Sequence, residues 1–567
     1  MATLKKPTLT PKEKKQYEFD ILKEYTSFKD DTKNDLVMRI NGATAKRGSS
    51  GYQFAGYNTL EQFYRGDQWD KDAAPGASQK TDNYCAVIVD NLSSLIFDDA
   101  PELNCPTDDP TDEVAEIKAE MKERMLWKVW NDNDYEVELD QWAKQTSLYG
   151  DGFMKGPWME KVDEYGNLIP PGQKGNWKIR FQHIENPASV RLIFADSGNR
   201  KLLAFIQDDR IPLSKAIKLY GDLAAAKGIK ITASLNSDPW VSGLDTVSKT
   251  PQVNISEMWD NKKMSIYIND QLLDYYEHNW GFVPLQYAKN NYVPNHPYGK
   301  SDLEDVLDPQ LAHNTTNNDL ANLLKWISSV NMWGKNIEGM QALVAGISRI
   351  YSLPEDGEMH TFEKTGDPYI ANTFVQQRRS AIVEISGMSE SMMSSSQMSN
   401  ASGRALALAF QGTIRKLNPR AKMFKTCLKH MNENIFKLYE IYFPDTKLII
   451  DGDYRNEVFL PTTLLRNIVD TINKFQSGLI SQDTAMREAG VSQPNLERKV
   501  MRRDLEDPVL GPQVARQPSL LPRLNEGENG GGSNPMPGAG SGASASQDGA
   551  VAANNNSSSG GAPVPVQ

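Results

Sequence analysis

The chain has 567 residues, of which 39% are hydrophobic and 24% charged, so it is long and apolar enough to form several folded domains. A formal net charge of −11 disfavours tight wrapping of DNA, which needs clustered lysine and arginine, but it leaves brief or sliding contact with DNA open. Three scattered cysteines and the lack of a long apolar run argue against a disulfide framework, a zinc site and a membrane-spanning helix.

The N-terminal arm, residues 1–56, is mixed in charge. Its apolar side chains from Tyr17 to Phe28 recur at helical spacing, which predicts an amphipathic arm or helix. A tail that orders only against a partner fits the same pattern.

The next two stretches differ in their periodicity. Residues 57–152 read as helical, with an apolar helix stopped by Pro101 and a later helix stopped by Gly150. From 153 to 293, short alternating runs separated by Gly, Pro, Asn and Asp predict a β-rich domain with one inserted helix at LSKAIKLYGDLAAAKG.

A helix follows within residues 301–330. Ser301 with Glu304 forms a possible capping box, and Asp308 followed by Pro309 offers an alternative start. The polar middle of this helix, NTTNN, suits a helix packed beside copies of itself with one side in water. Short pieces then predict a small module, and ANTFVQQRRSAIVEISGMSESMM predicts a return helix.

The segment SMMSSSQMSNASGRALALAFQG, residues 391–412, turns abruptly from small uncharged residues into a strong helix former. It predicts a mobile surface loop that touches a partner without gripping it; a disordered connection between helices explains the composition equally well. The helical pattern continues to residue 442, with an interruption near Asn418 and Pro419.

The C-terminal part begins with KLIIDGD, which predicts a strand and a turn. Residues 461–507 read as helical with a turn at GLISQDT. Residues 511–567 contain too little apolar surface to fold and predict a disordered tail.

No catalytic motif stands out. The phosphate-binding loop, the HExxH zinc motif and the GxSxG hydrolase elbow are all missing from the sequence, and the six histidines never pair at metal-ligand spacing. Acidic clusters such as Asp132 to Asp140 could hold Mg²⁺, but a solvated acidic face is the favoured interpretation. We therefore expect no enzyme activity and no cofactor.

Several segments nevertheless occur in a distinctive order. YRGDQWD precedes NYCAVIVDNLSSLIFDDAP and SLYGDGFMK; then come FVPLQYAKNNYVPNHPYGKSDLEDVLDPQLAHNTTNN, NASGRALALAF and SGLISQDTA. This order resembles the portal proteins of tailed double-stranded DNA bacteriophages, and the resemblance covers about residues 57–507.

The resemblance implies an α+β portal-type protomer in a ring of about twelve copies at one capsid vertex, the head–tail connector. It implies contact with double-stranded DNA, the terminase motor, a head-completion or neck adaptor, and the major capsid and scaffolding proteins, but not with a membrane. The expected location is the virion, and the host cytoplasm during assembly. The implied parts are a wing (57–300), a stem (301–330 and 369–393), a clip (331–368), a tunnel loop (394–402), a long wing helix and strand (403–460), a crown (461–510) and the disordered tail (511–567).

The uncharged loop agrees with a channel through which DNA slides, because a lining of lysine and arginine would bind phosphates and stall it. Arg378, Arg379 and Arg404 are exceptions that could touch DNA or pair with acids of a neighbouring subunit, and pairing is favoured. The channel-loop residues implied are Met392, Met393, Ser394, Ser395, Ser396, Gln397, Met398, Ser399 and Asn400.

Two other functions remain open from the sequence. A capsid-associated or scaffolding protein that encloses no channel is the first alternative. A metal-dependent hydrolase that uses Asp132 or Asp134 is the second.

Overall fold

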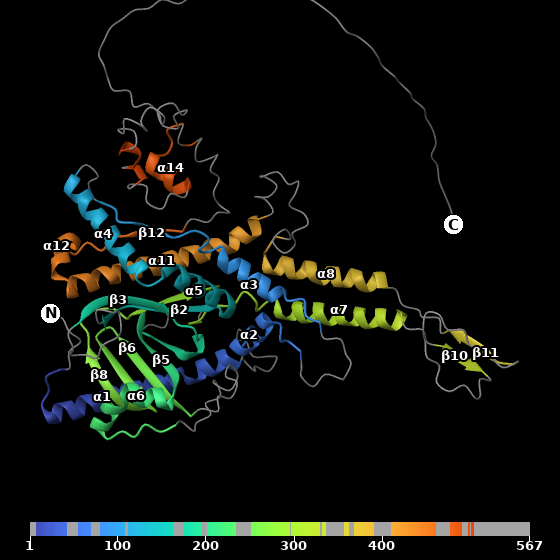
Figure 1. Ribbon diagram of the computed structural model, residues 1–567, viewed down its shortest axis with the longest axis horizontal. Coiled ribbons are helices and arrows are strands. Elements are labelled where there is room, and N and C mark those ends of the chain that lie inside the picture. The colour runs from blue at the N-terminus through green and yellow to red at the C-terminus, as the bar shows by residue number, and fades with distance from the viewer. Residues whose placement is uncertain are drawn as a thin grey trace, which may run out of the picture.

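The computed structural model consists of a body of helices and sheets from which a helical hairpin projects (Figure 1). This mixture confirms the predicted α+β class. The nine predicted channel-loop residues, Arg404, the tail from 511, and most of the predicted clip and crown lie outside the described residues. The structure describes residues 7–41, 55–69, 80–107, 112–162, 175–195, 201–233, 251–294, 296–328, 332–335, 356–361, 368–389, 410–460, 474, 477–489, 497–498 and 500–503.

A five-stranded antiparallel sheet lies between two helices. α1 (Pro11–Asn41) packs on one face through Ile21 and Tyr25, and the Tyr25 ring stacks on that of Tyr267 with the centroids 3.7 Å apart. α6 (Leu213–Lys227) covers the opposite face, because alternate strand residues point to opposite sides. The arm is therefore a helix packed on its own chain. In sheet order the strands are β4 (Val190–Phe194), β5 (Leu202–Pro212), β6 (Gln252–Asp260), β7 (Lys263–Ile268) and β8 (Gln271–Glu277).

The largest core joins a three-stranded antiparallel sheet to the helices around it. Trp130, Trp142 and Phe424 are fully buried there; the rings of Trp142 and Phe424 meet edge to face, 4.8 Å apart. The Trp130 indole N–H donates to Asn432 Oδ1 at 3.0 Å, which satisfies a buried donor. The elements are β3 (Asn176–His183), β2 (Asp151–Val162) and β9 (Leu285–Lys289), with α2 (Tyr57–Arg65), α3 (Tyr84–Ser94), α4 (Glu113–Asn131), α5 (Tyr135–Tyr149) and α11 (Gln411–Tyr442).

The projecting hairpin consists of α7 (Leu307–Ser328) and α8 (Pro368–Ser386), which lie side by side (Figure 1). At its far end β10 (Met332–Lys335) pairs antiparallel with β11 (Glu358–Thr361). None of the helices in the described part of the chain is long and apolar enough to cross a membrane. The remaining elements are η1 (Pro187–Ser189), β1 (Glu102–Asn104), which pairs with β12 (Glu457–Phe459), η3 (Pro444–Thr446), α12 (Lys447–Ile450) and α14 (Gln482–Ala489).

Three local predictions were wrong. KLII forms the short helix α12 rather than a strand, because its run of three apolar residues is too short for periodicity to distinguish the two structures. α11 continues through Pro419, whose neighbours Leu417 and Arg420 are both buried, so tertiary contacts offset the proline penalty of about 3 kcal/mol. The apolar helix α3 ends at Ser94, well before Pro101.

Candidate functional site

The α7–α8 hairpin leaves several large apolar side chains exposed. Tyr369 is 76% exposed and Phe374 is 53% exposed. Soluble monomers seldom leave several such side chains exposed on one projecting element, so this surface has the character of an assembly contact. The other exposed apolar residues of the hairpin are Leu311, Leu324, Ile370 and Ile385.

The polar middle of α7 binds the segment from Lys80 to Asp82 of the same chain. The Asn318 side chain pairs with both backbone groups of Lys80: Oδ1 accepts from its N–H at 2.9 Å, and Nδ2 donates to its carbonyl at 3.3 Å. One turn earlier, Asn314 Oδ1 accepts from the N–H of Asp82 at 3.0 Å, and Gln310 donates to the Asp82 carbonyl.

The four-residue spacing of Asn314 and Asn318 suits hydrogen bonds to residues two apart in the other segment, Lys80 and Asp82. Residues four apart on a helix rise about 6 Å, and residues two apart on a strand rise about 6.6 Å. Asn314 and Asn318 are buried, so their amides bind within the subunit. The expectation that this polar stretch lies wet beside another copy was therefore wrong for these two residues.

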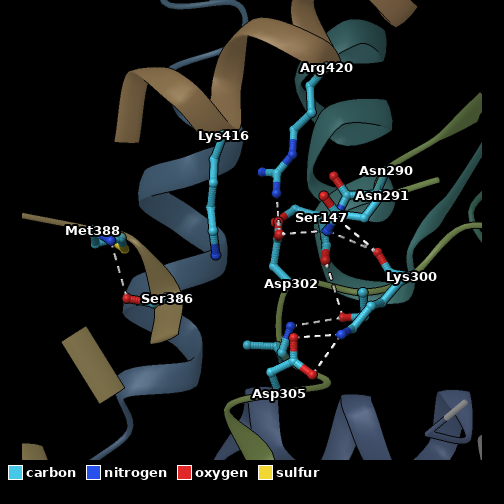
Figure 2. Close-up of polar contacts among 12 residues, drawn as sticks. Ser147, Asn290, Asn291, Lys300, Asp302, Asp305, Ser386, Met388, Lys416 and Arg420 are labelled. Atoms are coloured by element: carbon cyan, nitrogen blue, oxygen red, sulfur yellow. Dashed lines mark hydrogen bonds and ion pairs between the residues drawn. The ribbon is translucent and has the colours of Figure 1, made fainter. Parts of the chain in front are cut away.

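The start of α7 is fixed by a buried ion pair (Figure 2). Asp302 pairs with Arg420 of α11, and neither side chain is more than 1% exposed. Asp302 also accepts from the Ser147 hydroxyl at 2.7 Å and from the Asn291 amide at 3.4 Å. One carboxylate thus joins α11, α5 and the segment after β9.

The predicted capping box is not formed. Ser301 donates to the carbonyl of Leu148 at 2.6 Å and accepts from the N–H of Leu303, two residues along, at 3.1 Å. Glu304 accepts from the N–H of Ala55 at 2.6 Å, so the two side chains do not make the reciprocal bonds of a capping box. The helix begins at Leu307, which agrees with the alternative start near Asp308.

A second buried ion pair lies near the hairpin base. Arg39, at the end of α1, pairs with Asp151, and its guanidinium lies over the rings of Tyr57 and Tyr298 at 4.7 and 3.5 Å from their centroids. Together with Glu304 these side chains line a cavity of about 10 Å³. Burial raises the pKa of Glu304 to about 7 from its ordinary 4.5.

The C-terminal end of α8 is held against the first turns of α11. Gly387 adopts the left-handed conformation, with φ of +67°, and its amide N–H donates to the Val383 carbonyl at 3.0 Å. The Thr413 hydroxyl donates to the Gly387 carbonyl at 3.2 Å, and Lys416 Nζ donates to the Ile385 carbonyl at 3.1 Å. A Cβ on Gly412 would meet the Gly387 carbonyl at 3.1 Å.

The described residues on either side of segment 390–409 therefore lie next to each other, at the junction of hairpin and body. The segment between them contains all nine predicted channel-loop residues and Arg404. The placement of these residues themselves lies outside the described chain.

Arg378 and Arg379 of α8 face different surroundings. Arg378 is exposed, whereas Arg379 is half-buried. The Arg379 charge lies close enough to Tyr84 of α3 to oppose the rise in the pKa of that phenol, which burial causes. Arg379 thus makes an electrostatic contact within its own subunit.

The acids considered for a hydrolase serve as helix termini. Asp132 is the C-cap of α4 and Asp134 the N-cap of α5. Nowhere in the described ranges do three or more His, Cys, Asp or Glu side chains form a group that could hold a metal ion.

The described chain thus has a projecting helical hairpin with exposed apolar side chains, and the residues that flank segment 390–409 meet at its base. Comparison with protein-family models identifies the class as phage portal proteins, with residues 52–507 matched. This family is described as "Phage portal protein, SPP1 Gp6-like", and the chain belongs to it. No curated protein matches the chain at a significant level.

Proposed function

We propose that this chain assembles into a ring of about twelve copies at one capsid vertex and forms the channel through which the genome is packaged and ejected. The observation that carries the proposal is the uncovered apolar surface of the α7–α8 hairpin. In a closed ring the hairpin of each subunit packs against the next one, so every copy buries this surface by the same contact.

The proposed parts follow the order of the chain. The hairpin is the stem, and residues 331–368 at its far end, which include β10 and β11, are the clip. The clip docks the terminase motor during packaging and the neck adaptor afterwards. Residues 57–300 form the wing and 461–510 the crown, and the ring contacts the major capsid and scaffolding proteins during assembly in the host cytoplasm.

Residues 394–402 are the proposed tunnel loop. Its placement is supported by the meeting of residues 387 and 412 at the hairpin base, where a loop can extend from the stem toward a bore. Serine, glutamine, asparagine and methionine make weak, exchangeable contacts with a polymer of phosphates. Arg378 and Arg404 remain candidates for contact with DNA or with a neighbouring subunit. Portal proteins are structural components, and this function needs no catalysis.

Mass measurement and negative-stain imaging of the purified full-length chain test the proposal. We expect ring particles with a central hole. Phe374→Asn should weaken the ring, because it places an amide in the contact between stems, whereas Leu448→Asn, at an 82% exposed site on α12, should not. A compact monomer at every concentration would overturn the proposal, and assemblies without a central hole would favour a capsid-associated or scaffolding protein.

A further inference from the structure

The exposed side of α11 carries positive charge alone over most of its length. Residues 411–432 contain no acid, although the whole chain has a net charge of −11. Lys425 and Lys429 lie four residues apart, a spacing at which like charges on a helix repel, so this side favours an anionic partner. Its exposed cations form no ion pair within the described residues, and we call them the basic face: Arg415, Lys422, Lys425 and Lys429.

The junction of α4 and α5 carries the opposite charge. No lysine or arginine occurs in residues 131–143. Burial and the charge of Glu136 both raise the pKa of Asp140, so these acids repel each other. The apolar side chain of Val137 lies among them and is 53% exposed. The exposed acids, which likewise form no ion pair within the described residues, are the acidic face: Asp132, Asp134, Glu136 and Asp140.

The two charged faces are turned away from each other. The rings of Trp142 on α5 and Phe424 on α11 meet edge to face with their centroids 4.8 Å apart. Each residue adds a turn of about 100° around a helix, so Asp140 lies about 200° from Trp142, and Arg415 lies about 180° from Phe424. Each face is therefore on the far side of its helix from this contact, and the two faces do not neutralise each other within one subunit.

We propose that the basic face of α11 binds the acidic face of a neighbouring copy of this chain. A ring is closed by heterologous contacts, in which two different surfaces of each subunit meet. The two faces are complementary in charge, and because they are turned apart within one subunit, each can meet the opposite face of the next one. The inference rests on the proposed function, to which it adds a contact in the body of the subunit, outside the α7–α8 hairpin.

Reversing the charge of each face in the full-length chain tests this contact. Arg415→Glu with Lys429→Glu gives a chain with two acidic faces, and Glu136→Lys with Asp140→Lys gives one with two basic faces. We expect each double variant to raise the subunit concentration for half-assembly at least tenfold, measured by mass photometry at low salt. The quadruple variant should return to within threefold of wild type. High salt should reduce the differences, because exposed charges are screened.

An equimolar mixture of the two double variants provides the second readout. Neither should assemble alone at the concentration where wild type does, but the mixture should, because an acidic face then meets a basic one. Lys215→Glu with Lys218→Glu, at two exposed lysines of α6, is the control for net charge and should assemble as wild type does.

Three results would overturn the inference: assembly of both double variants as wild type, no rescue in either the mixture or the quadruple variant, or an equal loss in the α6 control. If a reversal variant does not fold, Arg415→Gln with Lys429→Gln removes the charges without reversing them. It should still raise the half-assembly concentration about threefold, and an unchanged value would again overturn the contact. Failure of the wild-type chain to form rings would instead overturn the proposed function.

Discussion

The buried pair between Asp302 and Arg420 allows a quantitative test of how the α7–α8 hairpin is held to the body. Both side chains are almost completely excluded from water, so removing one leaves the other as an uncompensated buried charge. Such a loss costs about 3–5 kcal/mol, whereas replacing both partners is often nearly neutral. The pair is thus expected to show strong coupling in a double-mutant cycle.

The surroundings decide where each variant falls in that range. In Arg420→Met the carboxylate keeps the hydroxyl of Ser147 and the amide of Asn291, so we expect a loss of about 3 kcal/mol. In Asp302→Asn the guanidinium loses its carboxylate, and its Nε and Nη1 already lack partners among the described residues, so we expect about 5 kcal/mol. The double variant should lose less than either single one.

Urea unfolding followed by tryptophan fluorescence measures these differences. All variants are compared at one subunit concentration, because assembly adds stability that depends on concentration. Lys422→Met, on the exposed side of α11, is the control and should change stability by no more than about 0.5 kcal/mol. Losses below about 1 kcal/mol for both single variants, or a double variant that loses their sum, would refute the reasoning.

Three further predictions concern other parts of the chain. The pKa of Glu304 is raised to about 7 in the folded chain, so the stability that its protonated form contributes is fully present below pH 4.5 and is lost as the pH rises through 7. In urea unfolding, Glu304→Gln should therefore be about 1–2 kcal/mol more stable than wild type at pH 8 and equal to it at pH 4. Equal stability of the two proteins at both pH values would contradict the raised pKa. Asn318→Ala should cost about 1–3 kcal/mol and speed hydrogen exchange at the Lys80 amide, while Asn322→Ala, exposed on the next turn, should do neither. A chain without residues 512–567 should still form rings, with the same number of subunits as the full-length chain by mass measurement. Loss of rings would show that the tail is needed.

Elements with a clear apolar period could be predicted from the sequence. The spacing of Ile21 and Tyr25 predicted the helix that packs on the sheet, and the alternating runs predicted the β-rich domain with its inserted helix, found at Leu213–Lys227. Gly150 ends α5 in the left-handed conformation, as its position suggested. In each case a local pattern and the tertiary contacts favour the same structure.

The contacts that hold the α7–α8 hairpin could not be predicted, because they join segments far apart in the chain. From the sequence, Asn314 and Asn318 were expected on a solvent-exposed helix face. No neighbouring residue in the sequence indicates that Lys80 and Asp82 lie against them. One signal was available: Arg420 interrupts a largely apolar stripe of α11, and a charge at such a position requires a buried partner. The partner itself, Asp302, could be identified only from the fold.

The N-terminal helix lies entirely before residue 52, where the family match begins, yet the fold depends on it. Its 31 residues form a helix about 45 Å long that reaches from the five-stranded sheet, where Tyr25 is buried, to Asp151 near the base of the α7–α8 hairpin. An expression fragment that starts at residue 52 would lack this helix. One face of the five-stranded sheet would then be exposed to water, and Asp151 would lose its ion pair with Arg39. Shortened versions of this portal subunit should therefore keep the first 41 residues.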